Sequence, residues 1–246
     1  MGLALTLAYA GCPGAELRGV RDDQRTSLAN FRAVLLDWRG TLAVGLNDRR
    51  WVQDALTLAG RDPGGAEALL AVVTPLADAL DGPGVDSDAA LHARTYRDVL
   101  GGAGLDQDLV AALYAVESDM GRNRFALDVA PTLTALREAG VAIGIVSDIH
   151  VDLRPVFVAA GLDPVVDAYI LSFEQGAQKP DPVVFTRTLD ALGVRADDAL
   201  MVGDRSRPDG GAVEVGIATL LLPPLRSVQD CRLHHALRLC GTSSQV

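Results

Sequence analysis

The stretch that decides the fold of this chain is AVLLDWRGTL, residues 33–42. It opens with an unbroken apolar run that closes on Asp37, a pattern typical of a strand buried on both faces of a parallel sheet. Four later runs of the same kind lie at residues 141–146, 168–171, 199–202 and 217–222. Helical patterns that each end before a glycine alternate with them, at residues 131–139, 153–160 and 182–192. Alternating strands and helices predict an α/β fold with a doubly wound parallel sheet.

A long helical insertion separates the first predicted strand from the rest of the sheet. Its helical patterns lie at residues 51–59, 66–80, 88–100 and 107–118, with Gly- and Pro-rich turns between them and no convincing strand. We expect this all-helical domain at residues 47–125 and the α/β core at residues 31–46 and 126–226. Residues 1–30 would then be an N-terminal extension, and residues 227–246 a C-terminal helix, over 228–239, with a polar tail.

Composition excludes several classes of function. The 246 residues hold 22 Lys and Arg against 32 Asp and Glu, a net charge of -10. Such an acidic protein is a poor match for nucleic acid or an anionic membrane as its main partner. No apolar run is long enough to cross a bilayer. The 3 cysteines are too few for a disulfide framework, so we expect a reducing cytoplasm. We also expect a monomer or homodimer, which no feature of the sequence decides.

Polar residues gather where the predicted strands end. Asp37 ends the first strand, Ser147 and Asp148 end the second, and Asp204 ends the fourth. Each alone would more often be a helix cap or a turn residue. Ligands of a doubly wound sheet bind beyond the carboxyl ends of its strands, so together these residues predict a site. Lys179, in the loop after the third strand, is the single lysine of the chain, and a functional role explains it best.

These motifs resemble the haloacid dehalogenase-like hydrolase superfamily. The matching segments, in the order of the family, are Asp37-Trp38-Arg39-Gly40-Thr41-Leu42, Ser147, Lys179-Pro180, and Gly203-Asp204 with Asp209. The resemblance covers about residues 32–224, and the helical insertion falls where the family places its cap domain. It implies a Rossmann-like core with a helical cap that closes over a small molecule.

The resemblance also implies the roles of the catalytic and metal-binding residues. Asp37 would be the nucleophile that forms an aspartyl-phosphate, assisted by Ser147 and Lys179. Asp37, Asp204 and Asp209 would hold Mg²⁺, which prefers carboxylate, carbonyl and water oxygens, and the backbone carbonyl of residue 39 would join them.

The expected substrate-binding residues are Arg39, Thr41 and Asp148, although Asp148 is more typical of a helix cap. The implied partner is a small phosphorylated molecule.

Arg39 departs from the family pattern. Family phosphatases carry there a second Asp, which protonates the leaving group, and a guanidinium cannot exchange a proton near neutral pH. Its side chain would bind the substrate or point into the cap interface. His150 could replace the missing proton carrier, or face solvent at a helix start.

Three hypotheses follow. The first is Mg²⁺-dependent hydrolysis of a small phosphate ester. The second is a catalytically weak or silent protein that binds a phosphorylated ligand or partner. The third is a 2-haloacid dehalogenase; the resemblance implies that such enzymes lack the acid found here at Asp204.

Overall fold

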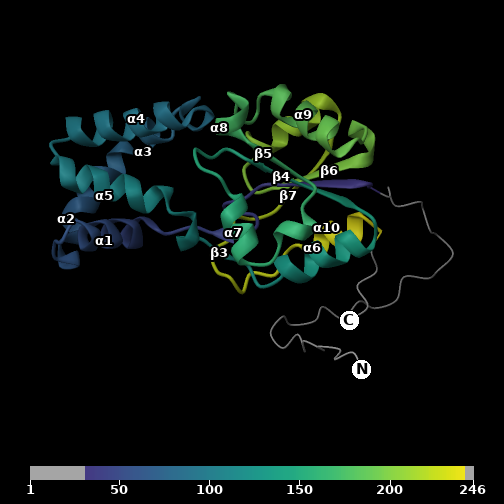
Figure 1. The fold of residues 1–246 in the computed structure, drawn as a ribbon, viewed down its shortest axis with the longest axis horizontal. Coiled ribbons are helices and arrows are strands. Elements are labelled where there is room, and N and C mark those ends of the chain that lie inside the picture. The colour runs from purple at the N-terminus through teal and green to yellow at the C-terminus, as the bar shows by residue number, and fades with distance from the viewer. Residues whose placement is uncertain (1–30, 242–246) are drawn as a thin grey trace.

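The computed structural model describes residues 31–241 and confirms the doubly wound α/β sheet (Figure 1). The expected N-terminal extension at residues 1–30 and the end of the predicted tail lie outside the described residues. Five parallel strands are ordered β5-β4-β1-β6-β7. They are β1 (Ala33–Leu36), β4 (Ala142–Ser147), β5 (Ala168–Leu171), β6 (Ala199–Gly203) and β7 (Ala218–Leu221). In the central register Leu36 lies between Ile145 and Val202, which brings three strand ends to the same edge.

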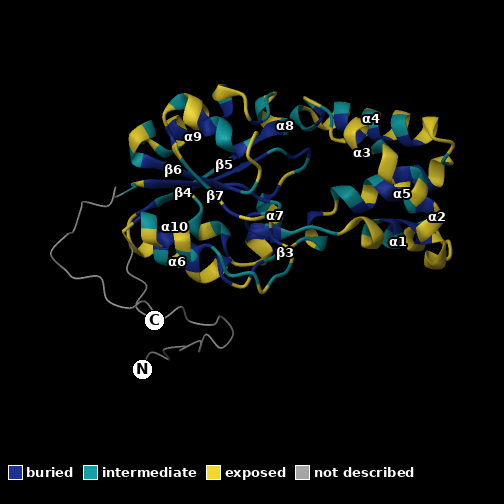
Figure 2. Ribbon diagram, turned by 180° about the vertical axis from the view of Figure 1, so that it is seen from behind, coloured by how far each residue is buried: buried dark blue, intermediate teal, exposed yellow. Residues whose placement is uncertain are grey.

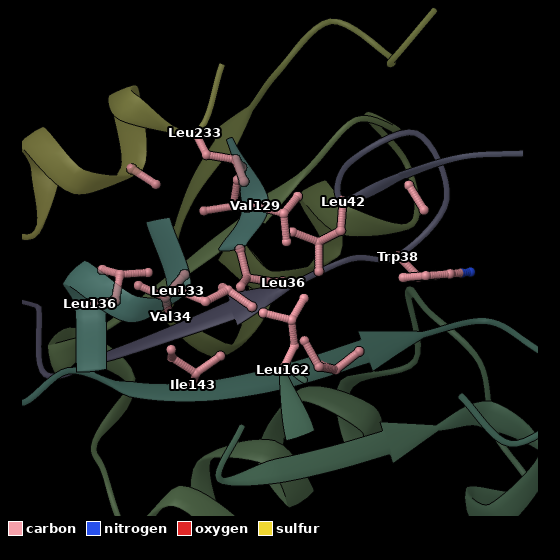
Figure 3. Close-up of a cluster of buried hydrophobic side chains, with 14 of the residues drawn as sticks. Val34, Leu36, Trp38, Leu42, Val129, Leu133, Leu136, Ile143, Leu162 and Leu233 are labelled. Carbon is pink, nitrogen blue, oxygen red and sulfur yellow. The ribbon is translucent and has the colours of Figure 1, made fainter. Parts of the chain in front are cut away.

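Alternate residues of β1 face two separate apolar layers, because successive side chains of a strand point to opposite faces. Val34 and Leu36 pack in one layer with Leu133, as Figure 3 shows. Ala33 and Leu35 pack in the other layer. The helices of the core are α6 (Val129–Glu138), α7 (Arg154–Ala159), α8 (Ser172–Gln175), α9 (Pro182–Leu192) and α10 (His234–Leu239). The unbroken apolar run of β1 is thereby explained: both of its faces are covered.

The cap is a helical body with its own apolar core, set to one side of the sheet (Figure 2). Its helices are α1 (Asp48–Leu58), α2 (Ala66–Val73), α3 (Ala77–Leu80), α4 (Ala89–Gly102) and α5 (Gln107–Ser118). The single helix predicted over residues 66–80 is wrong, because a 3-10 turn at Thr74–Leu76 divides it. Pro75 lies in that turn and has no backbone N–H to continue an α-helix.

A short antiparallel ladder closes the base of the cap. β2 (Ala43–Val44) pairs with β3 (Arg124–Phe125), so the two linkers between core and cap run side by side. The expectation that residues 47–125 contain no strand is therefore wrong, because β3 lies within them. Two-residue strands carry no periodicity that a sequence pattern can reveal.

The helix predicted over residues 228–239 forms only in its second half. The carboxylate of Asp128 accepts hydrogen bonds from the backbone N–H groups of Arg232 and Leu233, at 2.5 and 2.8 Å. Asp230 accepts in the same way from Arg226 and Ser227. These bonds compete with helical ones, so α10 begins only at His234. None of the helices in the described part of the chain is long and apolar enough to span a membrane.

Candidate active site

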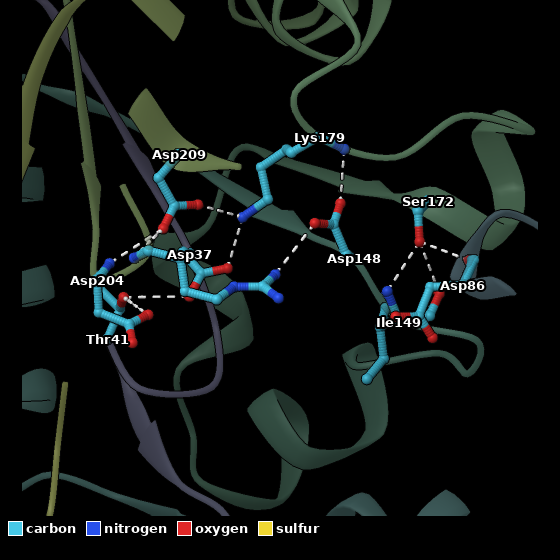
Figure 4. Close-up of polar contacts among 10 residues, drawn as sticks. Asp37, Thr41, Asp86, Asp148, Ile149, Ser172, Lys179, Asp204 and Asp209 are labelled. Atoms are coloured by element: carbon cyan, nitrogen blue, oxygen red, sulfur yellow. Dashed lines mark hydrogen bonds and ion pairs between the residues drawn. The ribbon is translucent and has the colours of Figure 1, made fainter. Parts of the chain in front are cut away.

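The strand ends of β1, β4 and β6 meet in one polar site, shown in Figure 4. Asp37 directly follows β1, and its backbone N–H donates to the Val202 carbonyl of β6 at 3.0 Å. Ser147 is the last residue of β4 and is buried. Asp204 directly follows β6. The structure thus brings these three predicted site residues to one edge of the sheet.

Lys179 connects two carboxylates inside this site. Its Nζ lies 2.6 Å from Asp37 Oδ1 and 2.6 Å from Asp209 Oδ1, and its side chain is 0% exposed. Burial alone would lower the pKa of Lys179, but the charges of Asp37, Asp148 and Asp209 outweigh burial and raise it. The single lysine is therefore a fixed positive charge against Asp37.

Asp209 lies behind the site and holds its parts together. While Oδ1 accepts from Lys179, Oδ2 accepts from the backbone N–H groups of Asp204 at 3.0 Å and Arg205 at 2.8 Å. The carboxylate approaches so closely that a Cβ on Gly203 would lie 2.2 Å from Asp209 Cγ. Both oxygens are thus engaged by the protein and the residue is fully buried, whereas Asp204 is the most exposed of the three carboxylates.

The donor set fits a hard divalent cation. Oxygens of Asp37, Asp204 and Asp209 lie within 4.8 Å of one another. Thr41 Oγ1 lies 3.1 Å from Asp37 Oδ2 and 3.4 Å from Asp204 Oδ1, so it connects the first two. Burial, together with the negative charges of Asp37 and Asp209, raises the pKa of Asp204 to about 6. A cation held by Asp37 and Asp204 would offset this repulsion, and oxygen ligands of this kind suit Mg²⁺.

The loop after Asp37 is shaped by a glycine and an arginine. Gly40 has φ +84°, and a Cβ there would lie 2.4 Å from Asp204 Oδ2. Arg232, from the segment before α10, donates through Nη2 to the carbonyls of Gly40 at 3.1 Å and Thr41 at 3.0 Å. Sequence reasoning missed Arg232, because nothing in its local pattern marks a contact with a loop so far away in the chain.

Both carboxylate oxygens of Asp148 have partners within the protein. Its Oδ1 accepts from the Lys179 backbone N–H at 2.8 Å and its Oδ2 from Arg205 Nη2 at 3.1 Å. Burial raises the pKa of Asp148 to about 6, against the opposing effect of Lys179. These contacts position the Lys179 loop, and a substrate-binding role of Asp148 stays a prediction. Arg205 was also missed, although its place directly after Asp204 was a signal that it lies at the site.

Arg39 reaches the cap. Its Nη1 lies 2.6 Å from Glu117 Oε1, and its Nε donates to Asn123 Oδ1 at 3.2 Å. Nη2 also donates to the Glu117 carbonyl at 3.3 Å. Of the two predicted orientations, the structure therefore shows the one into the cap interface, and a contact of Arg39 with substrate stays a prediction.

His150 is buried between core and cap. It is 2% exposed, and its Nε2 lies 2.9 Å from Ser118 Oγ at the end of α5. Its ring stacks on His92 of α4. The prediction that His150 faces solvent is wrong. The partners of His150, Ser118 and His92, lie on the cap and not at Asp37.

Comparison with known proteins identifies relatives of this arrangement. A family model described as haloacid dehalogenase-like hydrolase matches residues 31–214. The chain is 38% identical over 99 residues to the ribulose-1,5-bisphosphate 5-phosphatase of Halopiger xanaduensis, covering 39% of this chain and 41% of that protein. It is 33% identical over 138 residues to the glyceraldehyde 3-phosphate phosphatase of Methanopyrus kandleri, covering 52% and 58%. The matches thus span about half of these curated relatives.

Solved structures share the whole fold. A HAD phosphatase of Thermococcus onnurineus is similar with a TM-score of 0.59 and 24% identity, covering 86% of this chain and 99% of that one. A 2-haloacid dehalogenase of Pseudomonas syringae has a TM-score of 0.58 and 20% identity, covering 86% and 98%. At such identities the likeness establishes the fold and leaves the chemistry to the residues of the site.

Proposed function

This chain belongs to the haloacid dehalogenase-like hydrolase family, and we propose that it hydrolyses small phosphate esters with Mg²⁺, using Asp37 as the nucleophile. The observation that carries the proposal is the arrangement around Asp37. One of its oxygens lies 2.6 Å from a buried lysine, and the other shares the Thr41 hydroxyl with Asp204. Similarity to two named phosphatases supports the same reaction class.

The site residues perform the reaction in two steps. In the first, an Asp37 oxygen attacks phosphorus, the bond from phosphorus to the ester oxygen breaks, and the leaving group departs with its electron pair. In the second, a water oxygen attacks phosphorus, the bond from phosphorus to the Asp37 oxygen breaks and its electron pair returns to the carboxylate, and the protons of the water leave with the released dihydrogen phosphate. Lys179 supplies positive charge to Asp37 and the phosphate, and Ser147 donates its hydroxyl to a phosphate oxygen. A bound Mg²⁺ would supply further positive charge between carboxylate and phosphate.

The leaving group receives no proton from Arg39. A guanidinium stays protonated at neutral pH, and this one already donates to Glu117 and Asn123. Loss of a positioned acid typically costs about 10²- to 10⁴-fold in rate. We therefore propose substrates whose leaving group is stable without a proton, such as aryl or acyl phosphates.

Asp204 favours this reaction over dehalogenation. The similarity to the 2-haloacid dehalogenase structure is a similarity of the fold alone. A second, half-buried acid beside the nucleophile, with its pKa raised to about 6, is useful where a cation is bound. It would only repel the carboxylate of a halogenated acid, which argues against that substrate class.

The test is hydrolysis of an aryl phosphate with and without Mg²⁺, by the natural protein and by Asp37→Asn. Asp197→Asn is the matched control, because Asp197 is an exposed carboxylate paired with Arg195. Activity that requires Mg²⁺, disappears in Asp37→Asn and persists in Asp197→Asn supports the proposal. Activity that survives in Asp37→Asn would reject the nucleophile. No activity in the natural protein would favour a silent protein that binds a phosphorylated ligand.

The remaining expectations stay predictions. We propose a small phosphorylated molecule as the partner, rather than nucleic acid or membrane, in agreement with the net charge of -10. A cytoplasmic location and a monomeric or homodimeric state are predicted in the same way.

A further inference from the structure

Two histidines stack across the boundary between cap and core. His92 lies on α4 of the cap, and His150 lies in the loop after β4 of the core. Their ring centroids are 3.4 Å apart and their planes differ by 7°. The two residues are 4% and 2% exposed. A face-to-face imidazole pair is thus buried at this boundary.

The pair lies at a second attachment of the cap, away from its linkers. Figure 1 shows the cap approaching α8 there, while β3 lies on the opposite side. The 3-10 turn η3 (Val85–Ser87) belongs to this attachment. Ser172 Oγ of α8 donates to the Asp86 carbonyl at 2.6 Å and accepts from the Ile149 backbone N–H at 2.8 Å, as Figure 4 shows. The histidines therefore sit where cap and core touch without a covalent link.

Asp86 faces both rings. Its Oδ1 lies 3.7 Å from His92 Nε2 and 3.8 Å from His150 Nδ1. The other titratable or charged groups around the pair are Tyr96, Tyr114, Glu117, Arg39 and Asp81. On the α8 side, Glu174 is already paired with Arg154 at 2.7 Å. Asp86 is the acid that faces the two rings directly, and one negative charge cannot balance two imidazolium ions.

A metal ion does not explain this cluster. Ligand atoms of Asp86, His92 and His150 do lie within 4.8 Å of one another. An imidazole, however, binds a metal along a lone pair in its own ring plane. Two nearly parallel planes 3.4 Å apart cannot both contain one ion, so coordination would require one ring to turn out of the stack.

Packing alone does not explain it either. His92 Nδ1 is buried with no hydrogen-bond partner in the described structure. An unsatisfied buried nitrogen is unfavourable, and a phenyl ring at position 92 would stack without that penalty. The property that imidazole adds is a charge that changes near neutral pH.

We infer that His92 and His150 form a pH-sensitive clasp, which holds the cap on the core at neutral pH and loosens it in acid. Protonation of both rings would place two positive charges face to face in a buried setting, and separation of the rings relieves this repulsion. The clasp concerns the position of the cap and does not depend on the proposed reaction.

The sign and size of the effect follow from His92. Burial, the neighbouring His150 and the charge of Arg39 lower the pKa of His92 from 6.5 to about 4, against the opposing effect of Asp86. Protons therefore bind more strongly when the rings are apart, and acid favours the separated state. If the pKa of His92 returns to 6.5 on separation, the separated state gains about 30-fold between pH 7.5 and pH 5.

The experiment is hydrogen–deuterium exchange of the chelator-treated protein at pH 7.5 and pH 5.0, corrected for the intrinsic pH dependence of exchange. The reporters are peptides that contain η3, the first turn of α4 and the loop at His150, and peptides from α9 serve as the internal reference. His92→Phe and His150→Phe keep an aromatic stack but remove one titrating ring each. His235→Phe is the matched control, because His235 is exposed and outside the clasp.

The expected result is exchange up to about 30-fold faster at pH 5.0 in the reporter peptides of the natural protein and of His235→Phe, with α9 unchanged. At least one of the two clasp variants should lose this response. The inference is overturned if the natural protein shows no acid response, or if both clasp variants keep it. It is also overturned if added Zn²⁺ protects the reporter peptides in the natural protein but not in His92→Phe, since that result would require a metal site.

Discussion

Removal of the buried lysine gives the sharpest test of the site. In Lys179→Met the carboxylates of Asp37 and Asp209, each 2.6 Å from Nζ, would face each other without a positive charge between them. Breaking a buried ion pair by removing one partner typically costs about 3–5 kcal/mol, because an unpaired charge stays buried. A domain of this size loses roughly 2–4 °C of melting temperature per kcal/mol, so we expect a loss of roughly 6–20 °C.

Arg154→Met is the matched control for this experiment. Arg154 also bridges two carboxylates, Asp152 at 2.9 Å and Glu174 at 2.7 Å, but its side chain is 39% exposed. Exposed pairs are typically worth at most about 1 kcal/mol, because water screens them. Each variant removes two ion pairs, so a difference between their melting temperatures reports the effect of burial.

The assay is thermal unfolding in the presence of a chelator, at pH 7.5 and pH 5.0. Protonation of either carboxylate relieves the repulsion in Lys179→Met, so its deficit should be largest at pH 7.5 and narrow as the pH falls. Adding Asp37→Asn to the variant should recover part of the loss at pH 7.5. A melting temperature no lower than that of Arg154→Met, or a deficit that does not change with pH, would refute the reasoning.

Three further predictions follow from the site. The kcat/KM of the natural protein for aryl phosphates should exceed that for alkyl phosphates by more than about 10²-fold, and equal values would contradict this prediction. The ratio should decrease in the double variant Arg39→Asp with Glu117→Gln, because the new Asp can protonate the leaving group and the neutral Gln does not repel it. Gly40→Ala should weaken Mg²⁺ binding, measured by calorimetry, by at least about tenfold, because the new Cβ would lie 2.4 Å from Asp204 Oδ2. Gly60→Ala is the control: Gly60 has a similar φ of +68° but open space around it, so this variant should bind Mg²⁺ as tightly as the natural protein. Mg²⁺ binds the ionised carboxylate, and the pKa of Asp204 is raised to about 6. The affinity for Mg²⁺ should therefore be constant above pH 7 and about tenfold weaker at pH 5. An affinity that does not change with pH would exclude Asp204 as a ligand.

The part of the fold that the sequence predicts is the part with local periodicity. The strand at residues 168–171 and the helix at residues 182–192 have the predicted limits, because burial on both faces and a glycine end leave clear patterns. The ladder of β2 and β3 has no such pattern, and the start of α10 depends on Asp128, far away in the chain. Local signals cannot show bonds of this kind.

The same distinction applies to the site. Asp37, Ser147 and Asp204 could be predicted, because each ends a strand and the carboxyl ends of parallel strands share one edge. The actual partners of Asp148 and Arg39 could not, since both depend on how a distant loop or the cap is placed. The sequence therefore indicates which residues gather at the edge, and the structure is needed to show which partners within the protein each of them has.

Arg39 and the histidine pair together suggest how cap position and chemistry are related. Arg39 is two residues from Asp37 and binds Glu117 and Asn123, near the linkers of the cap. His150 follows Ser147 by three residues and binds the cap on its other side. The ends of β1 and β4 are thus each followed by a side chain that contacts the cap. Any motion that lifts the cap must break the contacts of Arg39 or those of His150, so we expect the position of the cap to be coupled to the loops after Asp37 and Ser147.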